Sequence, residues 1–358
     1  MNFLAVLMLA VFGTGAANAR DIDYHQSNDL LAENNSKLIC KTENNIQFCT
    51  DQNSVPYTGL AFTIHPKKSL IGKLFHIKPK LKEEINFKNG KRDGLYKSYY
   101  ENGQLEDERH YKNGIYNGSY KSYYKNGQLL SEGNFKNGKR EGIRKSYYDN
   151  GQLLSEGNFK NDKCEGVGKS YYENGQLESE KNCKNGMLNG PAKDYYKSGK
   201  LRSEVIFKND NREGLEKIYY ENGQLDLEHN YINGMLNGPV KHYYKSGKLE
   251  SEVIFKNDNR EGLEKIYYEN GQLGLERNYI NGMLNGPAKS YYKSGKLRSE
   301  GNFKNDKREG LIKLYYENGQ LDMERNYKNG MLNGPAKSYS KKGKLKDETY
   351  FINDEPVK

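Results

Sequence analysis

Eleven glycines recur every 24 residues, with no insertion or deletion between them. They are Gly103, Gly127, Gly151, Gly175, Gly199, Gly223, Gly247, Gly271, Gly295, Gly319 and Gly343. A fixed period of this size is typical of one small supersecondary unit stacked on copies of itself, each burying its faces only against its neighbours. Because an active site needs unique residues in one place, the interval predicts a repeat architecture and argues against an enzyme.

One period has the pattern of a β-hairpin. Residues 94–114 read GLYKSYYENGQLEDERHYKNG. The dipeptide Asn102-Gly103 predicts a two-residue type I′ turn, which needs a positive φ at both central positions. This turn predicts the facing pairs Tyr100 with Leu105, Lys97 with Glu108, and Gly94 with Tyr111. A longer connection at residues 112–117 then returns the chain.

The return connection predicts the pairs Leu105 with Tyr124, Glu108 with Lys121, and Tyr111 with Gly118. Since the two registers agree, equivalent residues fall into columns across the strands. We therefore expect an all-β fold of tandem 24-residue antiparallel hairpins, which form one elongated, twisted, single-layer sheet.

Side chains alternate between two faces along each strand. One face carries the first Tyr of each Tyr-Tyr pair and alternating Lys and Glu, from Lys97 to Glu348. Each Lys–Glu pair contributes only about 0.2–1 kcal/mol, but together they fix the register. The other, apolar face carries the second Tyr, the Leu after the turn, a further aromatic residue and the glycines.

The apolar columns are our candidate binding face, because a single-layer sheet leaves such a stripe uncovered. Its residues are Tyr100, Leu105, Tyr124, Leu129, Tyr148, Leu153, Tyr172, Tyr196, Tyr220, Tyr244, Tyr268, Tyr292 and Tyr316.

Composition offers no sign of catalytic chemistry. The formal charge of +10 comes from 57 basic and 47 acidic residues that are interleaved, which is typical of a solvated face. The six His are scattered without metal-ligand spacing, so we interpret them as surface residues. No phosphate-binding Gly loop and no nucleophile–base set occurs. We expect no catalytic residue, cofactor, metal, small-molecule substrate or nucleic-acid partner.

The later repeats alternate between two types, so that the full period there covers two hairpins. Residues 203–250 and 251–298 differ at only five positions. This indicates recent tandem duplication and an adjustable copy number.

Residues 1–19 have the pattern of a secretory signal. An apolar run from Phe3 to Phe12 is followed by small residues that end at Ala19. The run is too short to span a membrane. We therefore expect export to the periplasm, the cell surface or the medium after cleavage near Ala19.

Residues 20–56 lie outside the repeat and contain two of the four cysteines. In an oxidising compartment Cys40 and Cys49 would close a small disulfide-stapled hairpin. Cys164 and Cys183 lie in one repeat, at positions where other copies mostly carry other residues. We interpret this second pair as drift, with a second disulfide as the alternative.

Residues 57–90 read as a divergent first repeat with a long basic loop at residues 65–82. The loop is expected to touch an anionic membrane or an acidic partner, or instead to cap the first repeat. Its candidate contact residues are Lys67, Lys68, Lys73, Phe75, Lys78 and Lys80. Tandem repeats follow over 91–354, and residues 355–358 form a short tail.

The repeated pattern Tyr-Tyr-x-Asn-Gly-x-Leu, followed by Glu-x-x-aromatic and an Asn-Gly or Asn-Asp loop, resembles the bacterial MORN repeat variant family. The resemblance covers about Leu81 to Asp354. It implies stacked antiparallel hairpins that bind proteins, and membrane attachment is proposed for MORN repeats generally. The family is often labelled as an antitoxin component, which implies a cytoplasmic partner toxin. Cell-wall-binding repeats also have Tyr-rich hairpins, but they are rich in Trp, which this chain lacks.

The sequence thus predicts a non-enzymatic, exported repeat protein that offers an extended protein-binding or scaffold surface. Two alternatives stay open. One is peripheral membrane attachment through the basic loop, and the other is a cytoplasmic antitoxin-like protein that neutralises a partner by binding it.

Overall fold

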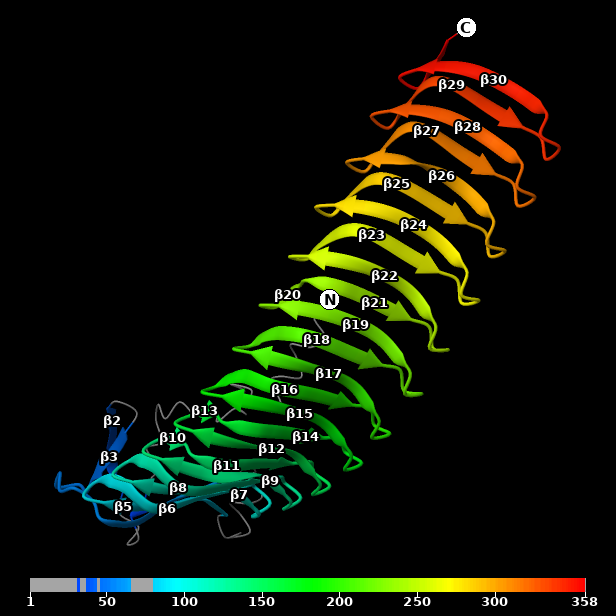
Figure 1. The fold of residues 1–358 in the computed structure, drawn as a ribbon. Helices are drawn as coiled ribbons and strands as arrows, with labels where there is room; N and C mark the ends of the chain where they lie inside the picture. The colour runs from blue at the N-terminus through cyan, green and yellow to red at the C-terminus, as the bar shows by residue number, and fades with distance from the viewer. Residues whose placement is uncertain (1–30, 33–36, 44–45, 66–79, 358) are drawn as a thin grey trace, which may run out of the picture. The chain divides into compact units, whose positions relative to one another are not determined.

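A computed structural model describes the chain except for residues 1–30, 33–36, 44–45, 66–79 and 358. The described residues form β-strands and no helix, and neighbouring strands pair antiparallel (Figure 1). Equivalent strands begin at Leu105, Leu129 and Leu153, so the predicted fold class of tandem antiparallel hairpins with a constant period is confirmed. Contacts divide the chain into a first unit, 1–190 with 197–199, and a second unit, 191–196 with 200–358.

The strands of the first unit are β1 (Leu31–Ala32), β2 (Ile39–Glu43), β3 (Ile46–Thr50), β4 (Gly59–Ile64), β5 (Leu81–Lys88), β6 (Lys91–Tyr99), β7 (Leu105–Lys112), β8 (Ile115–Tyr123), β9 (Leu129–Lys136), β10 (Lys139–Arg140), β11 (Gly142–Tyr147), β12 (Leu153–Lys160), β13 (Lys163–Cys164), β14 (Gly166–Tyr171) and β15 (Leu177–Lys184). The division between the units falls within β16 (Met187–Tyr195).

The strands of the second unit are β17 (Leu201–Lys208), β18 (Asn211–Tyr219), β19 (Leu225–Ile232), β20 (Met235–Leu236), β21 (Gly238–Tyr243), β22 (Leu249–Lys256), β23 (Asn259–Tyr267), β24 (Leu273–Ile280), β25 (Met283–Tyr291), β26 (Leu297–Lys304), β27 (Lys307–Tyr315), β28 (Leu321–Lys328), β29 (Met331–Tyr339), β30 (Leu345–Ile352) and β31 (Glu355–Val357).

The central register is the one that the sequence predicts. Lys97 faces Glu108, and Glu108 faces Lys121 on its other side. Gly94 faces Tyr111 as expected. The same Lys–Glu alternation continues within the second unit, for example between Lys337 and Glu348.

The turn predicted at Asn102-Gly103 is wrong in type. Gly103 donates its N–H to the Tyr100 carbonyl at 2.8 Å, and Tyr100 donates to the Gln104 carbonyl at 2.9 Å. Only Gly103 has a positive φ, of 93°, so this is a type I turn followed by a glycine bulge. Asn102 instead accepts the Gln104 N–H through its side-chain oxygen, at 3.0 Å.

The bulge at this turn also shifts the first pair of the hairpin. Tyr99 faces Leu105, whereas the sequence predicted Tyr100 in that place.

The type I′ turn lies at the opposite end of the hairpin. Lys112 faces Ile115, and the two residues between them, Asn113 and Gly114, have φ of 53° and 85°. The register of the two strands shifts between Arg109 and Tyr111, just before this turn. Tyr111 therefore faces Tyr116, whereas the sequence predicted that it would face Gly118.

A single-layer sheet still buries one of its faces. The strands are bowed (Figure 1), and the side chains of one face, which we call the inner face, are largely buried. In the first unit this inner face holds Ile85, Phe87, Tyr96 and Tyr111, all at most 8% exposed. Leu38 and Cys49 of the N-terminal segment pack against these residues, so this segment covers part of the inner face.

Candidate functional site

Within each unit the second tyrosines of the Tyr-Tyr pairs form a row, and we call these rows together the tyrosine rim. The rim consists of Tyr100, Tyr124, Tyr148, Tyr172, Tyr196, Tyr220, Tyr244, Tyr268, Tyr292 and Tyr316, all half-buried. The Tyr100 hydroxyl donates to the Tyr123 carbonyl, one repeat further on, at 2.6 Å. The same bond recurs from Tyr124, Tyr148, Tyr196, Tyr220, Tyr244, Tyr268, Tyr292 and Tyr316.

These rim hydroxyls are therefore used to tie successive hairpins together. A Lys ammonium lies over several rim rings, as Lys125 does at 5.9 Å from the Tyr100 ring centroid. The predicted Leu105, Leu129 and Leu153 are half-buried in the inner columns beside this turn. What the rim can offer a partner is thus a series of fixed aromatic planes.

The outer face is the side of the sheet opposite the inner face. It carries the first tyrosines of the Tyr-Tyr pairs and the alternating Lys–Glu pairs, which we call the ladder. Tyr147 donates its hydroxyl to Glu132 at 2.7 Å, while Lys145 lies 3.8 Å from Glu156. Burial, and then the bond to Glu132, raises the pKa of Tyr147 to about 12. The sequence predicted the ladder but missed this Tyr–Glu bond, although the constant separation of the two residues in every copy could have indicated it.

The same Tyr–Glu bond recurs throughout both units. It joins Tyr99 to Glu84, Tyr171 to Glu156, Tyr219 to Glu204, Tyr243 to Glu228, Tyr267 to Glu252, Tyr291 to Glu276, Tyr315 to Glu300 and Tyr339 to Glu324.

The inner face is built from contacts between residues with one shared separation along the chain. Most pair an Arg with an aromatic ring, as in Arg92 over Tyr111, Arg140 over Phe159, Arg212 over Tyr231, Arg260 over Tyr279 and Arg308 over Tyr327. One repeat instead pairs Tyr116 with Phe135, their ring centroids 5.4 Å apart. These pairs position the inner face and were not predicted.

The interpretation of the histidines as surface residues is wrong for His229 and His242. Both are half-buried on the inner face, with ring centroids 6.1 Å apart. His229 lies 3.4 Å from Glu216, whose side chain is only 4% exposed, and Arg212 lies 3.5 Å from the same carboxylate. Burial, and then the neighbouring His229, lowers the pKa of His242.

The next two-hairpin copy repeats this arrangement with a different cation. There Glu264 is buried, and Arg277 takes the position of His229 and forms an ion pair with it. Tyr279 donates its hydroxyl to the same carboxylate at 3.3 Å. A buried carboxylate needs such a partner because an unpaired buried charge is costly. These groups therefore hold the inner face together.

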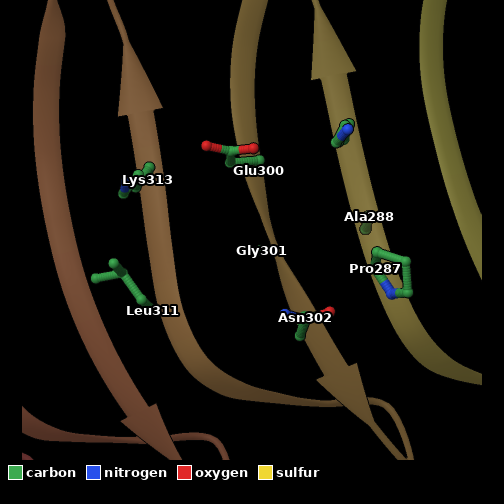
Figure 2. A pocket seen from close by; sticks show the side chains of 8 residues that line it. Pro287, Ala288, Glu300, Gly301, Asn302, Leu311 and Lys313 are labelled. Atoms are coloured by element: carbon green, nitrogen blue, oxygen red, sulfur yellow. The ribbon is translucent and has the colours of Figure 1, made fainter.

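A shallow depression of about 170 Å³ lies on the outer face of the second unit (Figure 2). Pro287 and Leu311 form apolar sides, and the backbone at Gly301 contributes to the floor. Lys289, Glu300, Asn302 and Lys313 of the ladder region and Ala288 complete the lining. Within the described part of the chain, no group of three or more His, Cys, Asp or Glu residues could hold a metal ion.

The family model described as MORN repeat variant matches eleven consecutive segments. They are residues 92–113, 116–137, 140–161, 165–185, 188–209, 212–233, 236–257, 260–281, 284–305, 308–329 and 332–353. These segments make up more than half of the chain. The chain belongs to the MORN repeat variant family. This family is a non-catalytic type of repeat.

Other comparisons add little to the MORN repeat assignment. No curated protein matches the sequence. The crystal structure of TcdB2-TccC3-Cdc42 is similar at 12% identity over 88% of this chain and 20% of that chain, with a TM-score of 0.16. A Tc holotoxin pore of Photorhabdus luminescens is similar at 12% identity over 90% and 21%, with a TM-score of 0.17. This MORN repeat chain thus spans about a fifth of those chains, and such low scores carry no functional argument.

The cysteines of this MORN repeat protein are joined in two disulfides. Cys40 is bonded to Cys49 across β2 and β3, at a Cα–Cα distance of 4.2 Å. Cys164 is bonded to Cys183, with Cα atoms 5.7 Å apart. The interpretation of this second pair as drift is therefore wrong. Its two residues have the same separation along the chain as Arg140 and Phe159, so they take the place that an Arg–aromatic contact has in other repeats.

Most of the predicted basic loop cannot be placed on this MORN repeat fold. Lys67, Lys68, Lys73, Phe75 and Lys78 lie outside the described residues. Lys80 is exposed and donates to the Glu101 carbonyl at 2.9 Å. The described residues contain no helix that could cross a membrane.

Proposed function

We propose that this MORN repeat protein is a non-enzymatic, exported scaffold that binds a protein partner along the tyrosine rim. The observation that carries the proposal is the fixed geometry of the rim, where a hydroxyl-to-carbonyl hydrogen bond holds nine of the rings. Held aromatic rings supply large contact areas and lose little conformational entropy on binding. Tyr is accordingly enriched at protein interfaces.

Repetition suits this function better than it suits catalysis. A partner that contacts several equivalent rings binds each further ring as an intramolecular event, so the affinity grows with the number of rings engaged. Near-identical copies at residues 203–250 and 251–298 extend the same surface, and they add no new chemistry.

Site-specific photo-crosslinking in the native host tests the rim. A photoreactive phenylalanine analogue replaces Tyr148, and the matched control carries it at Tyr147, which points to the outer face. Each substitution removes one hydrogen bond that a tyrosine hydroxyl donates, so each variant loses the same number of hydrogen bonds. We expect a discrete crosslinked protein from position 148 alone. Equal yields from both positions, or no product from either, contradict the rim as the binding surface.

Export is the second part of the proposal, and it is supported by the signal-like segment at residues 1–19. N-terminal sequencing of the mature protein is expected to show that its first residue lies near Arg20. A protein that retains Met1 or Asn2 removes the export proposal and favours the cytoplasmic antitoxin-like alternative.

Membrane attachment through the basic loop predicts that the protein co-sediments with anionic vesicles. A deletion of residues 66–79 would then abolish this co-sedimentation.

A further inference from the structure

The outer face of the second unit carries a strip of exposed apolar side chains next to the ladder. This outer strip consists of Ile206, Leu215, Ile232, Met235, Ile254, Leu263, Ile280, Met283, Leu311 and Met331, each between 39% and 53% exposed. Exposed apolar side chains that recur along one face of a sheet mark interaction sites, whereas single scattered ones are normal. The strip therefore points to an interface.

The spacing of the strip restricts what can cover it. Ile254 repeats Ile206, and Leu263 repeats Leu215, at an interval that spans four strands. With neighbouring strands about 4.8 Å apart, equivalent apolar groups recur roughly every 19 Å. A second copy of this chain presents apolar groups at the same interval.

The charges beside the strip are complementary to themselves. Lys265, Glu276, Lys289 and Glu300 face one another in turn on β23 to β26, so the sign alternates with each strand. Two such ladders match about a two-fold axis that runs parallel to the strands, midway between β24 and β25. Glu276 of each copy then meets Lys289 of the other, and Lys265 meets Glu300. An axis through a strand would instead place like charges together.

Any axis midway between two neighbouring strands of the ladder pairs Lys with Glu. The depression beside Gly301 distinguishes the axis between β24 and β25 from the others. The axis places β23 of one copy against β26 of the other, so that Leu263 lies over Asn302 and the depression that it lines. Leu263 is 40% exposed and thus free to enter it. Pro287 and Leu311 provide apolar sides, and the floor at Gly301 is backbone.

We propose that two copies of this chain associate through their outer strips, with Leu263 of each seated in the Gly301 depression of the other. Because the strands are bowed, two outer faces meet along a strip and not over their whole area. The apolar contacts supply most of the affinity, since exposed ion pairs contribute little. The tyrosine rim and the inner face stay free in both copies, so the association does not depend on the rim as a partner site.

Engineered cysteines test the proposed register. A chain with both Leu263→Cys and Asn302→Cys is expected to form a covalent dimer on a non-reducing gel. Within one chain β23 and β26 are three strands apart, about 14 Å, which exceeds the roughly 7 Å that a disulfide can bridge. The four native cysteines are already paired and do not interfere.

The matched control carries Ile143→Cys and Asn182→Cys in the first unit. This pair has the same separation in sequence, and its strands, β11 and β15, are also three apart. We expect no covalent dimer from it. Equal dimer yields from the two pairs, or none from the first, overturn the proposed axis.

Sedimentation velocity on the purified protein tests the association itself. We expect a concentration-dependent dimer whose dissociation constant rises at least tenfold in Leu263→Lys and stays unchanged in Ile143→Lys. Both residues are exposed at equivalent strand positions, and far-ultraviolet circular dichroism checks that both variants fold. A wild-type chain that stays monomeric at its highest soluble concentration overturns the proposal. The sedimentation experiment contains no partner protein, so a monomeric result does not test whether the tyrosine rim binds a partner.

Discussion

At the scale of residues, neighbouring tyrosines of one type have different roles. Tyr243 points to the outer face and donates to Glu228 at 2.7 Å. Tyr244 belongs to the rim and donates to the Tyr267 carbonyl at 2.7 Å. The alternation of side chains along a strand separates the two roles. Each Tyr-Tyr pair therefore stabilises both the charged ladder and the stacking of hairpins.

The outer tyrosines predict a loss of stability in alkali. Burial and the bonds to Glu raise the pKa of Tyr219, Tyr243, Tyr291 and Tyr315 to about 12, from 10.0. Since the folded state then holds protons that the unfolded state loses, this stability is fully present below pH 10. It is lost as the pH rises from 10 to about 12.

Phenolate absorbance in the near ultraviolet and the thermal midpoint measure this effect together. We expect the midpoint to stay level up to about pH 10 and then to fall, with many phenolates appearing only as the chain unfolds. Full ionisation of the tyrosines near pH 10 in a still-folded chain would contradict the assignment.

Glycines of the repeat differ in what a side chain would meet. Gly118 has a φ of 122°, and an added Cβ would lie 2.9 Å from the His110 Cβ. Gly142 has a φ of 82°, and nothing lies within 4 Å of an added Cβ. Gly142→Ala should therefore cost about 1–2 kcal/mol through its backbone alone, and Gly118→Ala should cost more. Urea denaturation of the two variants measures the difference, and an equal loss would exclude the steric contribution.

At the scale of elements, the hairpin at residues 94–114 closes with two different turns that contain the same dipeptide. Asn113-Gly114 forms a type I′ turn, whereas Asn102-Gly103 belongs to a type I turn with a bulge. The register of Lys97 and Glu108 follows from the period and was predictable. Which turn forms at which end depends on the bulge at Tyr99, and a dipeptide does not reveal it.

The inner face was predicted less well than the outer one, for a physical reason. A Lys–Glu pair in the ladder is visible as an alternation of charge, but the pairs of the inner face have mixed chemistry. Arg140 with Phe159 and Cys164 with Cys183 occupy equivalent places. Only their shared separation along the chain connects them, so the disulfide was mistaken for drift.

The Cys164–Cys183 disulfide predicts a local loss of stability on removal. Replacing both cysteines with Ser should cost about 2–4 kcal/mol, because the bond no longer constrains the unfolded chain and its site is left underpacked. Cys164→Leu combined with Cys183→Phe should recover part of this loss, since Leu236 and Phe255 occupy the same positions in the second unit. Thermal denaturation with and without a reductant checks both variants, and equal midpoints for the two would argue against packing as a cause.

At the scale of the whole molecule, the repeat allows a copy to be removed without a change in any remaining pairing. Residues 203–250 and 251–298 are nearly identical, so deleting 203–250 joins Arg202 to the residue equivalent to its natural neighbour. Stability in repeat proteins is approximately a sum over neighbouring units. The shortened chain should therefore fold, with its circular dichroism signal per residue unchanged.

The control is a deletion one residue shorter, of 203–249. A slip of one residue moves side chains to the opposite face of a strand, so Lys would leave Glu and buried rings would become exposed. We expect this chain to unfold at a clearly lower temperature than the deletion of 203–250. Equal thermal midpoints would mean that the ladder does not fix the register. Because the deletion of 203–250 keeps β22 to β27, it should also retain the association through the outer strip, which sedimentation velocity on the same sample measures.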